Sequence, residues 1–111
     1  MVRDHRQTVK KAFESFLTYK QVMNCAEKTI VFYEMCYRFF VEFYGEDNPC
    51  SEITEQTIID YLLYLKENKN LAAESVATYL RGLRAIIYFF AKNKYLERFQ
   101  ISLPKTDDTI K

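Results

Sequence analysis

The chain contains few residues that interrupt helices, with two glycines and two prolines among 111 residues, and it contains no tryptophan. This scarcity excludes a Gly-rich phosphate loop and indicates one compact unit rich in long helices. A chain of this length can bury one core. Because nine Phe and nine Tyr supply all the aromatic rings, we expect stacked rings in that core with several phenol hydroxyls at its edge.

Cysteines and long apolar runs are also scarce. The three cysteines, Cys25, Cys36 and Cys50, are odd in number and show no Cys-x-x-Cys spacing, which argues against a disulfide framework or a zinc site. No charged-then-apolar leader opens the chain, and the apolar run AIIYFFA is far shorter than a bilayer span. We therefore expect a soluble protein of the reducing cytoplasm with no membrane partner.

Catalytic groups are missing as well. The single histidine, His5, lies near the start of the chain, and no Ser or Cys has a plausible histidine base. The acidic residues fall mostly on expected polar faces or loops, whereas general acid-base catalysis needs carboxylates that converge in a pocket. The sequence therefore predicts no independent enzyme activity, no metal, no cofactor and no small-molecule substrate.

Apolar residues at a spacing of three or four predict four helices. The first spans about residues 8–22. The second is expected to begin at Asn24, which has the spacing of a capping box with Glu27, and to end at Gly45. The stripes expected to face the core in these two helices are Val9, Phe13, Phe16 and Leu17, and then Ile30, Tyr33, Tyr37, Phe40 and Tyr44.

Thr54 is the expected N-cap of the third helix, and the loop ENKNLAAES leads into the fourth, which should end near Asn93. A short fifth helix or turn follows, and then an extended tail, because Pro104 disfavours helix at Leu103. The expected core stripes are Ile58, Tyr61, Leu62 and Leu65 in the third helix, and Val76, Leu80, Leu83, Ile87 and Phe90 in the fourth.

Charge is segregated along the chain although the net charge is only +1. Between Phe39 and Leu65 there is no Lys or Arg, and this stretch should point away from any polyanion. Its acidic residues are Glu42, Glu46, Asp47, Glu52, Glu55 and Asp60. The segment 74–105 is basic, through Arg81, Arg84, Lys92, Lys94, Arg98 and Lys105. Such a dipolar molecule can present a cationic face.

The side of the fourth helix opposite its apolar stripe carries small, hydroxyl and guanidinium groups: Ser75, Thr78, Arg81, Gly82 and Ala85. This strip suits a nucleic-acid groove, because Arg can bind guanine or phosphate, hydroxyls can reach phosphate oxygens, and Gly and Ala allow close approach of a backbone. The same pattern is also compatible with an ordinary solvated helix face.

Several motifs occur together in a fixed order: FESFLTYK in the first helix, EKTIVFY with Thr29 and Tyr33, ITEQTIIDYLLYL, ESVATYLRGLRAIIYFFAKNKYLE, and finally ISLPK. With this ordered set the chain resembles the N-terminal core-binding domain, a SAM-like helical domain, of tyrosine recombinases or phage-type integrases. One departure is Ala26, three residues before Thr29, where the family often has Ser.

The resemblance implies an all-α, four-helix orthogonal bundle that clamps duplex DNA for integration or excision. Residues 8–103 would form the domain, residues 1–7 a flexible terminus, and residues 104–111 the start of a linker to a C-terminal catalytic domain. That domain carries the family's catalytic residues, including a His-x-x-Arg that this chain lacks, so we expect no strand cleavage from the chain alone. Its partners would be double-stranded DNA and other integrase protomers.

The expected DNA contacts lie on the second helix, the fourth helix and the linker. Lys28 and Thr29 would bind phosphate, because a helix N-terminus favours an anion. The others are Ser75 and Thr78 for phosphate or base edges, Arg81 as the base reader, and Arg84 and Lys105 for phosphate. Thr29 could instead be a simple first-turn residue and Arg84 an ion-pair partner. Tyr79 is expected at the edge of the core rather than on DNA.

A protein-interaction module is the alternative, in which the same helices offer an apolar groove to a partner helix without intrinsic affinity for DNA. The two interpretations differ in one structural feature. A DNA-binding domain requires the basic residues of the second and fourth helices to converge on one surface.

Overall fold

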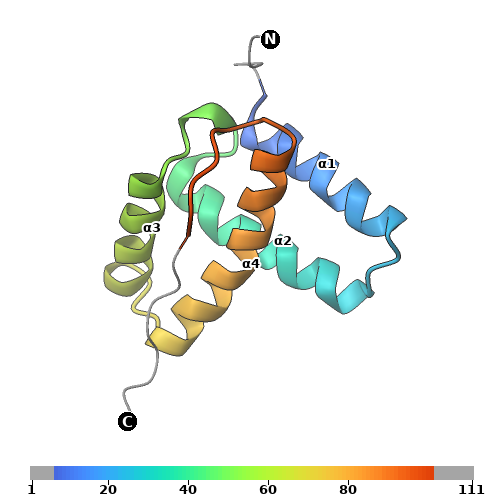
Figure 1. Ribbon diagram of the computed structural model, residues 1–111. Helices are drawn as coiled ribbons and strands as arrows, with labels where there is room; N and C mark the ends of the chain where they lie inside the picture. Colours follow the sequence, from blue (N-terminus) through green and yellow to red (C-terminus); the bar gives the residue numbers. More distant parts are fainter. Residues whose placement is uncertain (1–6, 102–111) are drawn as a thin grey trace.

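The computed structural model describes residues 7–101, and within them every long element is an α-helix. The elements are α1 (Val9–Val22), α2 (Glu27–Tyr44), the short 3-10 helix η1 (Cys50–Glu52), α3 (Glu55–Glu67) and α4 (Ala73–Lys92) (Figure 1). The all-α, four-helix prediction is confirmed. The described residues contain no strand and only an isolated bridge between Thr8 and Pro49.

The expected helix ends agree with the structure except at the start of α2, and they include the end of α1 at Val22 and the stop of α2 at Gly45. Thr8 caps α1, where its Oγ1 accepts from the N–H of Lys11 at 3.2 Å. Thr54 caps α3 in a capping box with Thr57, and α4 ends at Asn93. Residues 93–96 then form a turn.

The expected start of α2 at Asn24 is wrong. Asn24 has a φ of 60°, and its N–H donates to the carbonyl of Gln21. It therefore belongs to the end of α1, where asparagine tolerates the left-handed conformation. The N-cap of α2 is Ala26, which makes no side-chain hydrogen bond.

The helices pack around α4. The pair α2 and α4 forms the most extensive helix contact, while α1 and α3 lie on either side of it. After α4 the chain turns back along that helix, where the N–H of Ile101 meets the Tyr88 hydroxyl at 3.1 Å. Figure 1 shows this returning segment beside α4, with the starts of α2 and α4 both in the lower half of the molecule.

Every residue of the expected stripe on α4 is buried, and so are Ile58, Tyr61 and Leu65 of α3. The stripe expected on α2 is only partly correct, because Tyr33, Tyr37 and Tyr44 are half-buried while Cys36 is fully buried. The reason is that α2 packs on two sides. Tyr37 stacks on Phe13 of α1 with 3.9 Å between ring centroids, whereas Cys36 faces α4.

Phenol hydroxyls lie at the edge of the core, as predicted. Tyr44 Oη donates to the Pro49 carbonyl at 2.6 Å, and Tyr37 Oη donates to Glu46 Oε1 at 3.4 Å. Tyr61 is the exception in the described part of the chain, because its hydroxyl is fully buried without a hydrogen-bond partner.

Gly82 is buried, and its expected place on the exposed strip of α4 is wrong. A Cβ at this position would overlap Cys36 Sγ and lie 2.9 Å from Phe32 Cε2. The glycine therefore allows α4 to approach α2, not a ligand. Ala85, from the same strip, is half-buried beside α1.

Candidate nucleic-acid interface

The crossing of α2 and α4 brings the first halves of these helices together. Phe32 and Cys36 of α2 meet Gly82 of α4. Lys28 lies one turn before Phe32 and Thr78 lies one turn before Gly82, so each is only about 6 Å along its helix axis from the crossing. Lys28 and Thr78 therefore both lie near the point where α2 and α4 cross.

Two of the four corners made by this crossing are filled by helices. The corner beside the end of α4 is filled by α1, through Phe16 and Phe89 at 5.4 Å between ring centroids. The corner beside the end of α2 is filled by α3, through Phe43 and Tyr61 at 5.7 Å. Within residues 7–101, no helix occupies the corner between the first halves of α2 and α4 (Figure 1), which we call the α2–α4 corner.

Helix geometry decides which predicted residues can border this corner. At about 100° per residue, Thr78 lies about 40° and Arg81 about 100° from the direction in which Gly82 faces α2, on the same side. Both are exposed. Arg84 lies about 160° from that direction and is half-buried, so it points away from α2.

The helix starts at the corner lack side-chain caps. Ala26 and Ala72 are the N-caps of α2 and α4 and make no cap hydrogen bond, whereas α1 and α3 are capped by threonines. Uncapped N–H groups and the helix dipole attract anions. Glu27 and Glu74 lie in the same first turns and oppose that attraction.

The predicted contact residues are available to different degrees. Lys28 and Thr29 are exposed and Ser75 is half-buried. Thr78 Oγ1 donates to the Glu74 carbonyl at 2.9 Å, so its proton is engaged while its lone pairs remain accessible. Lys105 lies outside the described residues.

Within residues 7–101 the one ion pair joins Lys69 Nζ to Glu42 Oε1 at 2.8 Å. Lys28, Arg81 and Arg84 form none with the described residues, which leaves the ion-pair interpretation of Arg84 without support there.

The family model of the phage integrase N-terminal SAM-like domain matches residues 12–98. The chain belongs to this family. The match spans α2, α3, α4 and all but the first turn of α1, and it describes the N-terminal domain of integrases rather than their catalytic domain. No curated protein and no solved structure matches the chain at a significant level.

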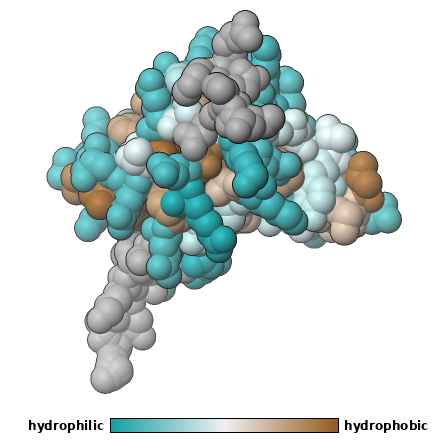
Figure 2. All heavy atoms as spheres, turned by 45° about the horizontal axis from the view of Figure 1, so that its top comes forward, coloured by the Kyte–Doolittle hydropathy of each residue, from teal (hydrophilic) through white to brown (hydrophobic). Residues whose placement is uncertain are grey.

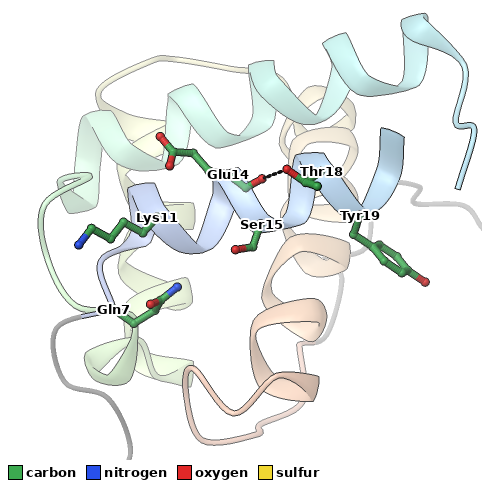
Figure 3. Close-up of a pocket in the computed structure, with 6 residues that line it drawn as sticks. All are labelled: Gln7, Lys11, Glu14, Ser15, Thr18 and Tyr19. Atoms are coloured by element: carbon green, nitrogen blue, oxygen red, sulfur yellow. Dashed lines mark hydrogen bonds between the residues drawn. The ribbon is translucent and has the colours of Figure 1, made fainter. Parts of the chain in front are cut away.

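The hollows that lie elsewhere on this SAM-like domain include two beside α1. One, of about 580 Å³, follows the outer face of α1 and is shallow and polar, with Lys11, Ser15 and Thr18 along it (Figure 3). The other, of about 330 Å³, is a groove between α1 and α4 lined by Phe16, Tyr19, Tyr88 and Phe89 together with Lys20 and Lys92. The second is largely aromatic, but it lies between α1 and α4 and not between α2 and α4, the helices on which the protein-interaction alternative expected an apolar groove.

Buried nucleophiles of the SAM-like domain are not activated. Burial raises the pKa of the Cys36 thiol, the Cys50 thiol and the Tyr44 phenol to about 12, and it also raises the pKa of Tyr61. These groups stay protonated at neutral pH and are poor nucleophiles. The described residues hold no His, Cys, Asp and Glu cluster able to bind a metal, and none of their helices is long and apolar enough to cross a membrane.

Exposed apolar residues were missed by the sequence analysis. Val31 and Met35 of α2 are 53% and 39% exposed, and Ile59 and Leu63 of α3 are 45% and 49% exposed. Hydrophobic surface also appears at the α1–α2 tip and on α3 in Figure 2. The sequence pattern did not mark these four residues, because two apolar residues on one side of a helix are too few to show a period. The spacing of four between Val31 and Met35, with a cation on either side, is the signal that could have identified that pair.

Proposed function

We propose that this SAM-like domain binds double-stranded DNA as the core-binding part of a site-specific tyrosine recombinase. One observation carries the proposal: the α2–α4 corner is open, and it is bordered by Lys28, Thr78 and Arg81 in a chain that belongs to an integrase family. A catalytic domain elsewhere in the full recombinase would cut and rejoin the DNA for integration or excision.

In this arrangement the first halves of α2 and α4 enter the major groove. Lys28 and Thr29, at the uncapped start of α2, bind phosphate, and Ser75 and Thr78 bind phosphate or base edges. Arg81 reads a base, because a guanidinium can form two parallel hydrogen bonds with guanine. Arg84 binds a flanking phosphate, which its side chain has to reach from the side of α4 that faces away from α2.

The domain boundaries belong to the same proposal. Residues 8–103 form the DNA-binding unit, and residues 104–111 lead toward the catalytic domain, with Lys105 touching phosphate as the linker crosses the duplex. The protein acts in the cytoplasm, where its three free cysteines stay reduced.

A salt titration of the chain on duplex DNA, followed by fluorescence anisotropy, tests the proposal. Affinity should fall steeply with salt. Arg81→Ala should weaken binding by about 1–3 kcal/mol, and Lys28→Ala should lower the salt slope by about one. Lys66→Ala is the matched control, because it removes an exposed cation from α3. Equal affinity for wild type and both corner variants would refute the assigned face.

A second candidate partner is another integrase protomer, favoured by the aromatic groove between α1 and α4. Its rim carries Tyr88, which is 39% exposed, and an apolar surface with a polar rim is typical of protein contacts. Sedimentation with and without DNA tests this. Tyr88→Ala should weaken self-association on DNA without weakening the binding of a single copy.

A further inference from the structure

One face of α2 carries two apolar side chains between two cations. Lys28, Val31, Met35 and Arg38 follow one another at spacings of three, four and three, and all four are exposed. At about 100° per residue they fall within an arc of about 80°. We call this set the α2 strip.

Neighbouring helices leave the α2 strip uncovered. Helix α1 packs on the side of α2 that carries Tyr33 and Tyr37, and α4 packs on the side that carries Phe32 and Cys36. Lys28 and Met35 therefore border the open α2–α4 corner, and Val31 follows them around the outer side of α2. Exposed single apolar residues are ordinary, but a pair on one face, with a cation at each end, calls for a specific ligand.

The cations of the strip are available for binding. Lys28 and Arg38 form no ion pair within residues 7–101. Arg38 shares a shallow hollow with Glu34 and Glu46, yet neither carboxylate pairs with it. Each end of the strip carries a cation that forms no ion pair with the described residues, and this favours an anionic ligand over an apolar protein surface, although Glu34 and Glu46 weaken the attraction at the Arg38 end.

We propose that Val31 and Met35 contact thymine methyl groups in the major groove while Lys28 and Arg38 bind phosphates on the two strands that border it. This inference rests on the proposed DNA-binding function and names what α2 reads. Ten residues separate the two cations, about 15 Å along the helix, which is close to the major-groove width of about 12 Å. Among the bases of DNA, thymine alone presents a methyl group there.

Replacing thymine by deoxyuridine tests the contact, because it removes the methyl groups while keeping base pairing and charge. The full chain is titrated by anisotropy against an alternating adenine–thymine duplex and against the same duplex with uracil. Each methyl contact should contribute about fourfold in affinity, the equivalent of about 0.8 kcal/mol for one buried carbon. Wild type should therefore prefer the thymine duplex by about 4- to 15-fold.

Variants assign that preference to the strip. Val31→Ala and Met35→Ala should weaken binding to the thymine duplex and reduce the difference between the two duplexes. Ile59→Ala and Leu63→Ala are matched controls, because they remove equally exposed apolar side chains from α3 and should leave the preference intact. Circular dichroism should show unchanged folding in all four.

Other outcomes would overturn the inference in distinguishable ways. Equal wild-type affinity for both duplexes, with Arg81→Ala still weakening binding, would reject methyl recognition and keep the proposed function. No binding to either duplex at low salt would reject both. A concentration-dependent dimer that Met35→Ala dissolves, with the duplex preference unaltered, would show that the strip binds a second copy instead.

Discussion

Gly82→Ala measures how closely α4 approaches α2. In an open helix this change would stabilise the protein by about 1 kcal/mol, because alanine has the higher helix propensity. At Gly82 the new Cβ would overlap Cys36 Sγ, which is fully buried, and lie 2.9 Å from Phe32 Cε2. Overpacking of a core costs about 1–3 kcal/mol. Set against the gain in propensity, this cost leaves a net loss of up to about 2 kcal/mol, so Gly82→Ala should not raise the melting temperature in thermal unfolding followed by circular dichroism.

Two comparisons make this expectation specific. Arg81→Gly and Arg81→Ala measure the propensity difference at the neighbouring exposed position, where alanine should be the more stable by about 1 kcal/mol. Cys36→Ala removes the sulfur that the new Cβ would overlap, so the double variant with Gly82→Ala should be less destabilised than the sum of the single variants, by about 1 kcal/mol. A Gly82→Ala protein more stable than wild type by about 1 kcal/mol, the gain expected in an open helix, would refute the close approach.

Three further predictions follow from other residues. Tyr61→Phe should raise the free energy of unfolding by about 1 kcal/mol, because it removes a buried hydroxyl without a partner; an unchanged or lower urea midpoint would contradict this. Glu27→Gln and Glu74→Gln should each tighten DNA binding at low salt, because they remove negative charge from the first turns of α2 and α4, whereas Glu55→Gln on α3 should not. The contribution of the Cys50 thiol to stability should be constant below about pH 9 and fall above it, because burial raises its pKa from 9.0 to about 12 and unfolding then releases protons; in Cys50→Ala the decline of stability above pH 9 should be smaller.

Much of the fold was accessible from the sequence, because single-sided helices reveal their buried face. The stripe of α4 and the cap at Thr54 were predicted correctly from spacing and residue type alone. Helix α2 was harder because it packs on two sides, which blurs the period of its apolar residues. At Asn24 the spacing to Glu27 predicted a capping box at the start of α2, whereas the residue adopts the left-handed conformation that ends α1. Residue type does not distinguish the two, because asparagine is common in both positions.

The candidate site was predictable only in its parts. Lys28, Thr29, Thr78 and Arg81 were named from helix starts and polar faces, and all four are exposed. Their common position around one open corner depends on where α2 crosses α4, and residue spacing within a helix carries no information on that crossing. Gly82 illustrates what spacing within one helix cannot predict. Its position on a polar face gave no indication that α2 would cover it.

The contact at Gly82 also sets a mechanical condition on binding. The backbone of α4 packs against Cys36 and Phe32 of α2. Because a change in the distance or angle between the two helices would disrupt this packed contact, α2 and α4 keep a fixed relative position. Under the proposed function, a duplex bound by both helices would have to match its groove width and curvature to this fixed arrangement. Deformable DNA sequences would then be favoured even at base pairs that no side chain touches.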